Sequence, residues 1–264
     1  MSVISNPIEI SAARRFLLLF GFGSVIAAIW SYLGLMIRDM SAMPEMSGAT
    51  MGMAQLDLFT PSYVGGLIVM WIVMQAAMML PSALPMIHGF ARMKASESGN
   101  PRLFLPLALF GGGYVAAWSA FSVGAALLQA GLTGTGVLSS MTMKFTGSGW
   151  GGGILILAGL YQWMPWKQAC LRHCRTPFGF LVTEWREGQL GPFMMGWRHG
   201  LFCMGCCWAI MFLLFVAGVM NPIWIVGIAA YVLAEKVMPH GGMMTKLVGV
   251  GLIVGGLGVM LGGG

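Results

Sequence analysis

The stretch "YVGGLIVMWIVMQAAMMLPSALPMIHGF", residues 63–90, contains no Asp, Glu, Lys or Arg and is apolar along nearly its whole length. An α-helix needs about 20 such residues to cross the hydrocarbon core of a bilayer. The stretch has no strict alternation of apolar and polar residues, which a strand of a membrane β-barrel would need. It therefore predicts a membrane-spanning helix.

The rest of the chain has the same character. Of its 264 residues, 58% are apolar and 8% are charged, whereas charged residues make up about 25% of a soluble domain. We expect an all-α fold, a polytopic transmembrane helical bundle that forms a single integral membrane domain over residues 1–264. It has about seven spans, at about 16–37, 63–90, 103–130, 150–170, 199–219, 221–238 and 246–262. The first span is expected to be retained rather than cleaved as a signal peptide, because its apolar run is long.

The basic residues predict how the chain is oriented in the membrane. With a cytoplasmic N-terminus, every Lys and Arg except Arg38 and Lys144 falls on the cytoplasmic side, as the positive-inside rule requires. The net charge of +6 is then explained by topology, and we expect no nucleic-acid partner. The expected location is the bacterial inner (cytoplasmic) membrane, with the lipid bilayer around the bundle.

Two loops are long enough to contribute to a functional site. The loop at about 38–62 is rich in methionine and is expected outside the cytoplasm, and the loop at about 171–198 is basic and cytoplasmic. A short amphipathic helix is predicted in the second loop near "FGFLVTEW", residues 178–185.

Two motifs repeat one spacing of metal-binding side chains. "CLRHC" places Cys170, His173 and Cys174 at offsets of three and four residues. "CMGCC" repeats these offsets with Cys203, Cys206 and Cys207. Residues three and four apart lie on one face of a helix, and the topology places both motifs at a similar depth on consecutive antiparallel helices. The sequence therefore predicts one metal site, or two neighbouring ones, near the cytoplasmic side.

Further candidate ligands lie close to the same side of the membrane. His199 precedes Cys203 by one helical turn, while His88 and Glu235 lie near the ends of the spans 63–90 and 221–238. Thiolate and imidazole groups select soft or borderline metal ions, so we expect Cu(I), with Zn(II) or iron as alternatives. Each of these residues taken alone is more often structural than functional. The repeated spacing is what indicates a metal site.

Methionine is unusually abundant, with 25 residues. Five methionines lie in the polar loop at about 38–62, where there is no core for them to fill; they are Met40, Met43, Met46, Met51 and Met53. Thioethers bind Cu(I) rather than hard cations, so the loop is a candidate outer copper site. Met70, Met74 and Met78 form a stripe along the span 63–90, for which core packing is the simpler interpretation and a path toward His88 is the alternative.

Four stretches resemble a bacterial domain-of-unknown-function family described as predicted metal-binding integral membrane proteins. They are "WIVMQAAMMLPSALP" (71–85), "WSAFSVGAALLQ" (118–129), "LAGLYQWMPWKQACLRHCRTP" (157–177) and "GLFCMGCCWAIMFLLFVAGVMN" (200–221), followed by Glu235–Lys236. The resemblance covers roughly residues 60–240. It implies an all-helical membrane protein with a metal site at Cys170, Cys174, Cys203, Cys206 and Cys207, and it implies no particular activity.

The sequence supports three functional hypotheses. The first is Cu(I) acquisition, transfer or transport, in which the Met-rich loop collects the ion and the Cys/His cluster passes it to a metallochaperone or to a membrane-complex partner. The second is a membrane metalloenzyme, or an accessory subunit, with a fixed metal centre; no catalytic motif assigns a reaction. The third is an assembly subunit without metal, whose glycine-rich helices pack against partners or form a homo-oligomer.

Overall fold

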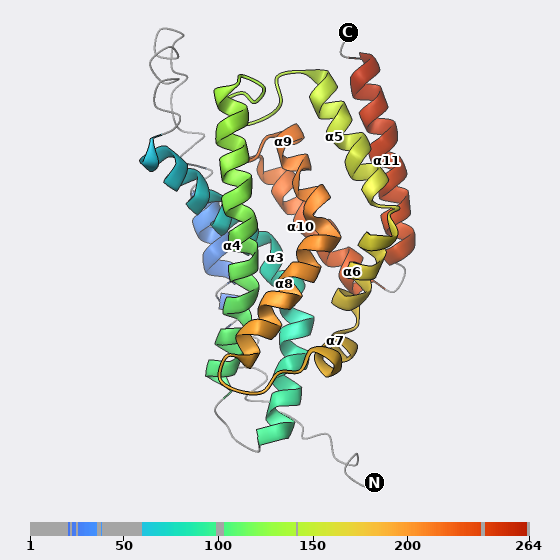
Figure 1. The fold of residues 1–264 in the computed structure, drawn as a ribbon. Helices are drawn as coiled ribbons and strands as arrows, with labels where there is room; N and C mark the ends of the chain where they lie inside the picture. The colour runs from blue at the N-terminus through green and yellow to red at the C-terminus, as the bar shows by residue number, and fades with distance from the viewer. Residues whose placement is uncertain are drawn as a thin grey trace.

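The computed structural model describes residues 21, 23–24, 26–35, 38, 60–98, 103–140, 142–238 and 241–262. Within these residues the chain is helical and has no strand; one isolated bridge joins Leu138 and Phe145 in a loop (Figure 1). The all-α prediction is thus confirmed for this part of the chain. Of the expected span 16–37, residues 26–35 are helical.

The helices from residue 60 onward follow one another along the chain. They are α3 (Pro61–Ser98), α4 (Phe104–Gly134), α5 (Ser148–Tyr161), α6 (Pro165–Arg175), α7 (Pro177–Glu184), α8 (Gly191–Met211), α9 (Leu213–Ala217), α10 (Pro222–Val237) and α11 (Gly241–Gly262). Four segments are long and apolar enough to cross a membrane, namely Pro61–Ala95, Phe104–Gly134, Gly191–Ala217 and Gly241–Gly262. These four correspond to the expected spans 63–90, 103–130, 199–219 and 246–262.

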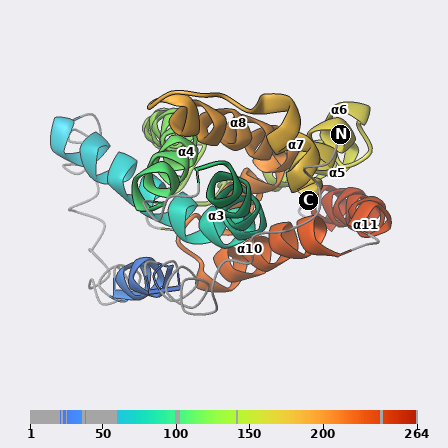
Figure 2. The same cartoon turned by 90° about the horizontal axis from the view of Figure 1, so that it is seen from below.

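α3 packs against α4, α7 and α10. Figure 2 shows α3 between α4 and α8 on one side and α10 on the other. Met70, Met74 and Met78 of α3 are buried, with Trp71, in the core of this bundle. The methionine stripe therefore serves as packing in this structure.

α4 and α8 approach closely because glycines lie at their interface. A Cβ at Gly196 would collide with the carbonyl of Phe110, and a Cβ at Gly200 would lie 2.6 Å from Cβ of Ala117. Small residues let helix backbones touch in this way. The contact brings Tyr114 of α4 against the part of α8 that carries His199 and Cys203.

α8 begins earlier than the sequence predicts. We expected residues 171–198 to form a loop, but α8 starts at Gly191, with Pro192 in its first turn, where the missing N–H of proline costs nothing. The remaining part of the predicted loop contains α7, which confirms the short helix near residues 178–185. An ion pair of 2.6 Å between Arg198 and Glu184 joins α8 to the end of α7.

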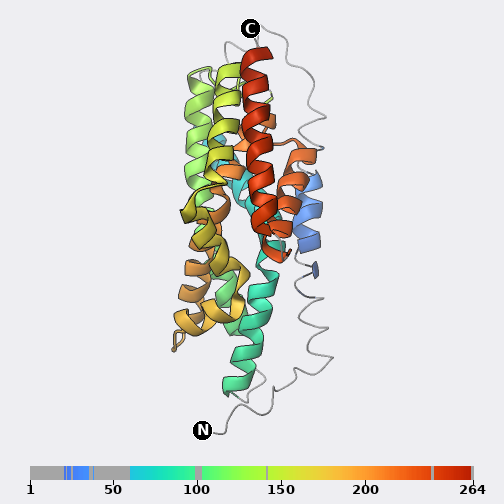
Figure 3. The same cartoon turned by 90° about the vertical axis from the view of Figure 1, so that its right-hand side faces the viewer.

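The expected span 150–170 is broken into α5 and α6. Pro165 opens α6, and Met164 before it is extended, with φ −66° and ψ 138°. Proline donates no backbone hydrogen bond and disfavours a helical residue before it, so the helix stops at this point. α5 packs along α11, whereas α6 packs against α8; Figure 3 shows α5 and α11 side by side.

α11 uses only part of its glycine-rich surface against α5. A Cβ at Gly256 would lie 2.7 Å from the carbonyl oxygen of Gly152, and a Cβ at Gly249 would lie 2.6 Å from the indole nitrogen of Trp163. Gly251 and Gly255, in contrast, have no neighbouring atom within 4 Å of such a Cβ. The contact with α5 and the residues after it therefore requires glycine at positions 249 and 256, but not at 251 and 255.

Candidate metal centre

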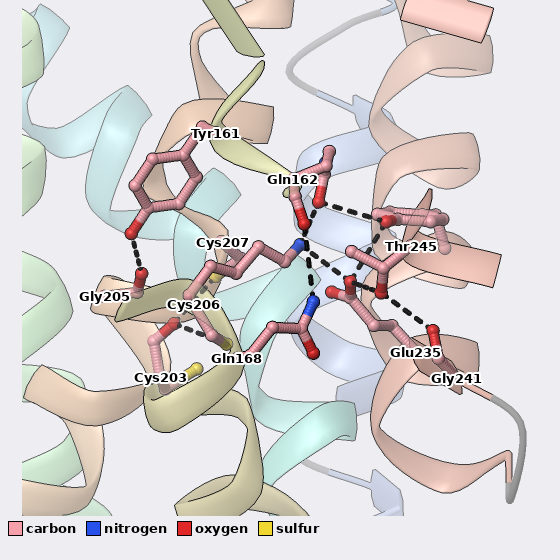
Figure 4. A network of polar contacts seen from close by, with 12 residues as sticks. Tyr161, Gln162, Gln168, Cys203, Gly205, Cys206, Cys207, Glu235, Gly241 and Thr245 are labelled. Carbon is pink, nitrogen blue, oxygen red and sulfur yellow. Dashed lines mark hydrogen bonds and ion pairs between the residues drawn. The ribbon is translucent and has the colours of Figure 1, made fainter. Parts of the chain in front are cut away.

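The five cysteines come from two neighbouring helices and form no disulfide. Cys170 and Cys174 lie on α6, and Cys203, Cys206 and Cys207 lie on α8. The three on α8 are completely buried, Cys174 is buried and Cys170 is half-buried. Figure 4 shows the α8 cysteines gathered on about one helical turn. We call these five residues the thiol cluster.

The two halves of the cluster are in contact. α6, which carries Cys170 and Cys174, packs against α8. Cys170 lies over Gly205, where an added Cβ would come within 2.9 Å of its sulfur. Gly205 is thus the small residue that lets α6 bring its thiols onto α8.

The sulfur of Cys203 has two polar side chains as partners, from α4 and α10. The ammonium of Lys236 on α10 donates to it over 2.9 Å, and the hydroxyl of Tyr114 lies 3.1 Å away. Lys236 also donates to the hydroxyl of Ser82 over 2.8 Å, and Tyr114 donates to the carbonyl of Met79 over 3.1 Å. The hydrogen bond from the Lys236 ammonium to the Cys203 sulfur is charge-assisted, and such bonds are stronger than those between neutral groups.

Cys206 and Cys207 are held in a different way. Both thiols donate to the backbone carbonyl of Cys203, each over 3.0 Å. The sulfur of Cys207 also lies 4.0 Å from the thioether sulfur of Met79 on α3. Soft donors from α3 and α8 therefore meet at this point.

The surroundings of the α6 thiols raise their pKa. Interactions with Cys203 and Cys206, together with burial, raise the pKa of the Cys174 thiol well above its usual range. Burial likewise raises the pKa of the Cys170 thiol. A metal ion that binds here must displace these protons, because the thiolate is the ligand.

The two predicted histidines near the cluster have opposite environments. His199 is 1% exposed, and neither ring nitrogen has a hydrogen-bond partner in the described part of the chain. Its ring stacks on Tyr114 at a centroid distance of 5.4 Å. His173 is exposed, stacks on Phe202 at 4.5 Å, and has Nδ1 2.9 Å from the carbonyl oxygen of Ala169. Only His199 has unused nitrogen atoms buried beside the cluster, and such unpaired groups are costly without a ligand.

Glu235 is engaged by a separate polar network rather than by the thiols (Figure 4). Its Oε1 lies 2.7 Å from the ammonium of Lys167 and accepts hydrogen bonds from Tyr231 over 3.0 Å and from Thr245 over 2.6 Å. Both charged side chains are completely buried. Lys167 also donates to Gln162, the residue after α5. The network ties the break between α5 and α6 to α10 and α11.

The remaining predicted ligands are His88 and the five methionines of the segment at about 38–62. His88 is half-buried on α3, six residues beyond Ser82, which is about 9 Å along a helix axis. Met40, Met43, Met46, Met51 and Met53 lie outside the described residues.

The cluster is a set of hydrogen-bonded thiols rather than a preformed coordination cage. In the part of the chain that the structure describes, no three His, Cys, Asp or Glu side chains already have the arrangement of a metal site. Cys206 and Cys207 must give up the protons that they donate to the carbonyl of Cys203 before they can act as thiolate ligands. The donors are nevertheless thiol, thioether and imidazole groups, and this chemistry fits Cu(I) better than any hard cation.

Sequence reasoning missed three residues at this site, namely Met79, Tyr114 and Lys236. Met79 follows the predicted methionine stripe directly, so its thioether was a visible signal. Tyr114 and Lys236 reach Cys203 from sequence separations of 89 and 33 residues. No local pattern marks these contacts.

Comparison with known proteins gives one match. The PpoB2 family, described as copper chaperone, matches residues 68–259, a range that contains Met79, Lys236 and the whole thiol cluster. No curated protein and no solved structure matches the chain. Since the match covers well over half of the sequence, the chain belongs to the PpoB2 family of copper chaperones.

Proposed function

We propose that the protein is a membrane copper chaperone that binds Cu(I) at the thiol cluster and passes it to an acceptor protein. The observation that carries this proposal is that α6 packs against α8 with Cys174 buried and with the sulfur of Cys170 over Gly205, between Cys203 and Cys206, inside a bundle of apolar helices. The family match supports copper as the cargo.

The chemistry of the cluster suits transfer of a monovalent soft ion. Cu(I) prefers thiolate and thioether ligands, and it can move between neighbouring sulfurs by exchanging one ligand at a time. The cluster offers thiols that are hydrogen-bonded rather than fixed around an ion. His199 and the thioether of Met79 supply further donors for intermediate steps.

The proposed topology has seven spans with a cytoplasmic N-terminus, in the bacterial inner membrane. In this arrangement the Met-rich segment at about 38–62 faces outward and collects Cu(I), while the thiol cluster receives it near the cytoplasmic side. The acceptor is a metallochaperone or a subunit of a membrane complex. The distribution of Lys and Arg supports this orientation.

The test is the copper content of the purified protein. The full chain is loaded with Cu(I) under anaerobic conditions in detergent, and copper, zinc and iron are counted per chain by elemental analysis. We expect bound copper in the wild type and loss of most of it in the variant Cys203→Ser/Cys206→Ser/Cys207→Ser. A monodisperse elution profile and an unchanged helical circular dichroism spectrum serve as the folding controls. Equal copper in both proteins would refute the proposal.

A fixed metal centre in an enzyme or accessory subunit is the second candidate. The complete burial of the three α8 cysteines favours it, because a buried ion is slow to leave. Exchange of bound copper against an isotopically labelled Cu(I) complex separates the two functions. A chaperone exchanges its metal within minutes, whereas a fixed centre retains the original isotope.

A further inference from the structure

One buried cation, Lys236, contacts the thiol cluster and has no acidic partner among the residues that the structure describes. Lys236 is 7% exposed, and its ammonium donates to the hydroxyl of Ser82 and to the sulfur of Cys203. The ion pairs of the described residues join Lys167 to Glu235 and Arg198 to Glu184. No described carboxylate neutralises Lys236.

The neighbouring acid does not supply the missing negative charge. Glu235 directly precedes Lys236 on α10, but its Oε1 lies 2.7 Å from the ammonium of Lys167. Lys167 and Glu235 together are neutral. The positive charge of Lys236 is therefore left facing the sulfur of Cys203, 2.9 Å away.

A buried charge is costly unless an opposite charge lies next to it. At Lys236 the opposite charge has to come from the thiolates of the cluster. A pair of thiolates that holds a monovalent ion carries one net negative charge, which the ammonium cancels. A divalent ion on the same pair is already neutral and leaves the ammonium uncompensated, so it needs a third thiolate to reach the same balance.

We propose that Lys236 is a specificity-determining residue, which selects Cu(I) over divalent ions by balancing the charge of a bis-thiolate complex. The inference rests on the proposed copper-binding function of the thiol cluster. It concerns the choice of ion rather than the existence of the site. The ammonium acts as a fixed counter-charge and is not itself a ligand.

The test compares three variants by the ratio of their Cu(I) and Zn(II) affinities. Lys236→Gln removes the charge, Lys236→Arg keeps it, and Lys246→Gln removes a charge from an exposed position on α11. Purified proteins are titrated with Cu(I) and with Zn(II) against chromogenic chelators of known affinity. We expect Lys236→Gln to lower the preference for Cu(I) by roughly tenfold or more, as the loss of a close counter-charge at low dielectric implies. Lys236→Arg and Lys246→Gln should stay within about threefold of the wild type.

The outcomes separate this inference from the proposed function. If the wild type binds copper and Lys236→Gln keeps the wild-type preference, the charge selection is refuted while the copper site stands. If the wild type binds no Cu(I), the proposed function itself fails.

A second measurement needs no variant. X-ray absorption of the wild-type protein should find a pair of sulfur ligands around Cu(I) and at least one additional sulfur around any Zn(II) that is taken up. A Zn(II) ion held by only a pair of sulfurs would overturn the inference.

Discussion

The thioether sulfur of Met79 lies 4.0 Å from the sulfur of Cys207, although the two residues are 128 positions apart in the chain. Met79 belongs to α3 and is completely buried. The carbonyl of Met79 accepts a hydrogen bond from the hydroxyl of Tyr114 on α4, and its sulfur faces Cys207 on α8. This placement makes Met79 a third source of soft donors, beside α6 and α8.

Replacing this thioether should weaken copper binding without disturbing the fold. Met79→Leu keeps the side-chain volume, so the stability cost should stay below about 1.5 kcal/mol. We expect the Cu(I) affinity to fall by roughly threefold to tenfold, as for the loss of one weak ligand. Met74→Leu, at an equally buried position of the same helix, is the matched control. Competition with a Cu(I) chelator measures both, and equal affinities would show that Met79 serves packing alone.

The imidazole of His199 should contribute to Cu(I) affinity and not to the stability of the fold. Both of its nitrogens are buried without a partner, so His199→Phe removes unpaired polar atoms and keeps the ring contacts with Tyr114. We expect an unchanged or higher unfolding temperature and a lower Cu(I) affinity. His173→Phe, on the exposed face of α6, should leave the affinity at the wild-type value. If the His199→Phe protein binds Cu(I) with the wild-type affinity, the side chain of His199 serves only core packing.

The buried pair of Lys167 and Glu235 should stabilise the fold without holding the metal. Glu235→Gln leaves the ammonium of Lys167 buried without a counter-charge, and breaking such a pair costs about 3–5 kcal/mol. We expect a marked fall in the unfolding temperature measured in detergent, together with an unchanged copper content in the fraction that remains folded. If the Glu235→Gln variant loses copper while its unfolding temperature equals that of the wild type, Glu235 is instead a metal ligand.

The contact between α4 and α8 should be intolerant of a single methyl group. Gly196→Ala would place a Cβ against the carbonyl of Phe110, and overpacking of this kind costs about 1–3 kcal/mol. Gly251→Ala, at an open position of α11, should be neutral or slightly stabilising. Thermal unfolding of the two variants tests this difference. Equal stability would mean that the two helices are not held in direct contact.

The sequence predicts the helical segments well wherever an apolar run is uninterrupted. The span 63–90 lies within α3, and the span 103–130 lies within α4 except for its first residue, because a long apolar run permits only a helix in a membrane. Where the predicted helix bounds differ from the structure, proline or glycine residues account for the difference. Pro165 breaks the span 150–170, and the glycines and the arginine of residues 191–200 concealed the first turns of α8.

The candidate site could be predicted only in part. The spacing of the cysteines placed thiols of α6 and α8 on facing surfaces, but the same spacing also assigned His173 to that surface. A small rotation of α6 is enough to leave His173 exposed while Cys174 is buried. The positions of Tyr114 and Lys236 depend on how α4, α8 and α10 pack, which no local pattern determines.

The most direct test of the account is the X-ray absorption spectrum of copper bound to the full-length protein. If Cu(I) binds at the thiol cluster, the wild type should show a first coordination shell dominated by sulfur, and the Cys203→Ser/Cys206→Ser/Cys207→Ser variant should lose that shell. A first shell of nitrogen and oxygen in the wild type, or the same spectrum for both proteins, would contradict it.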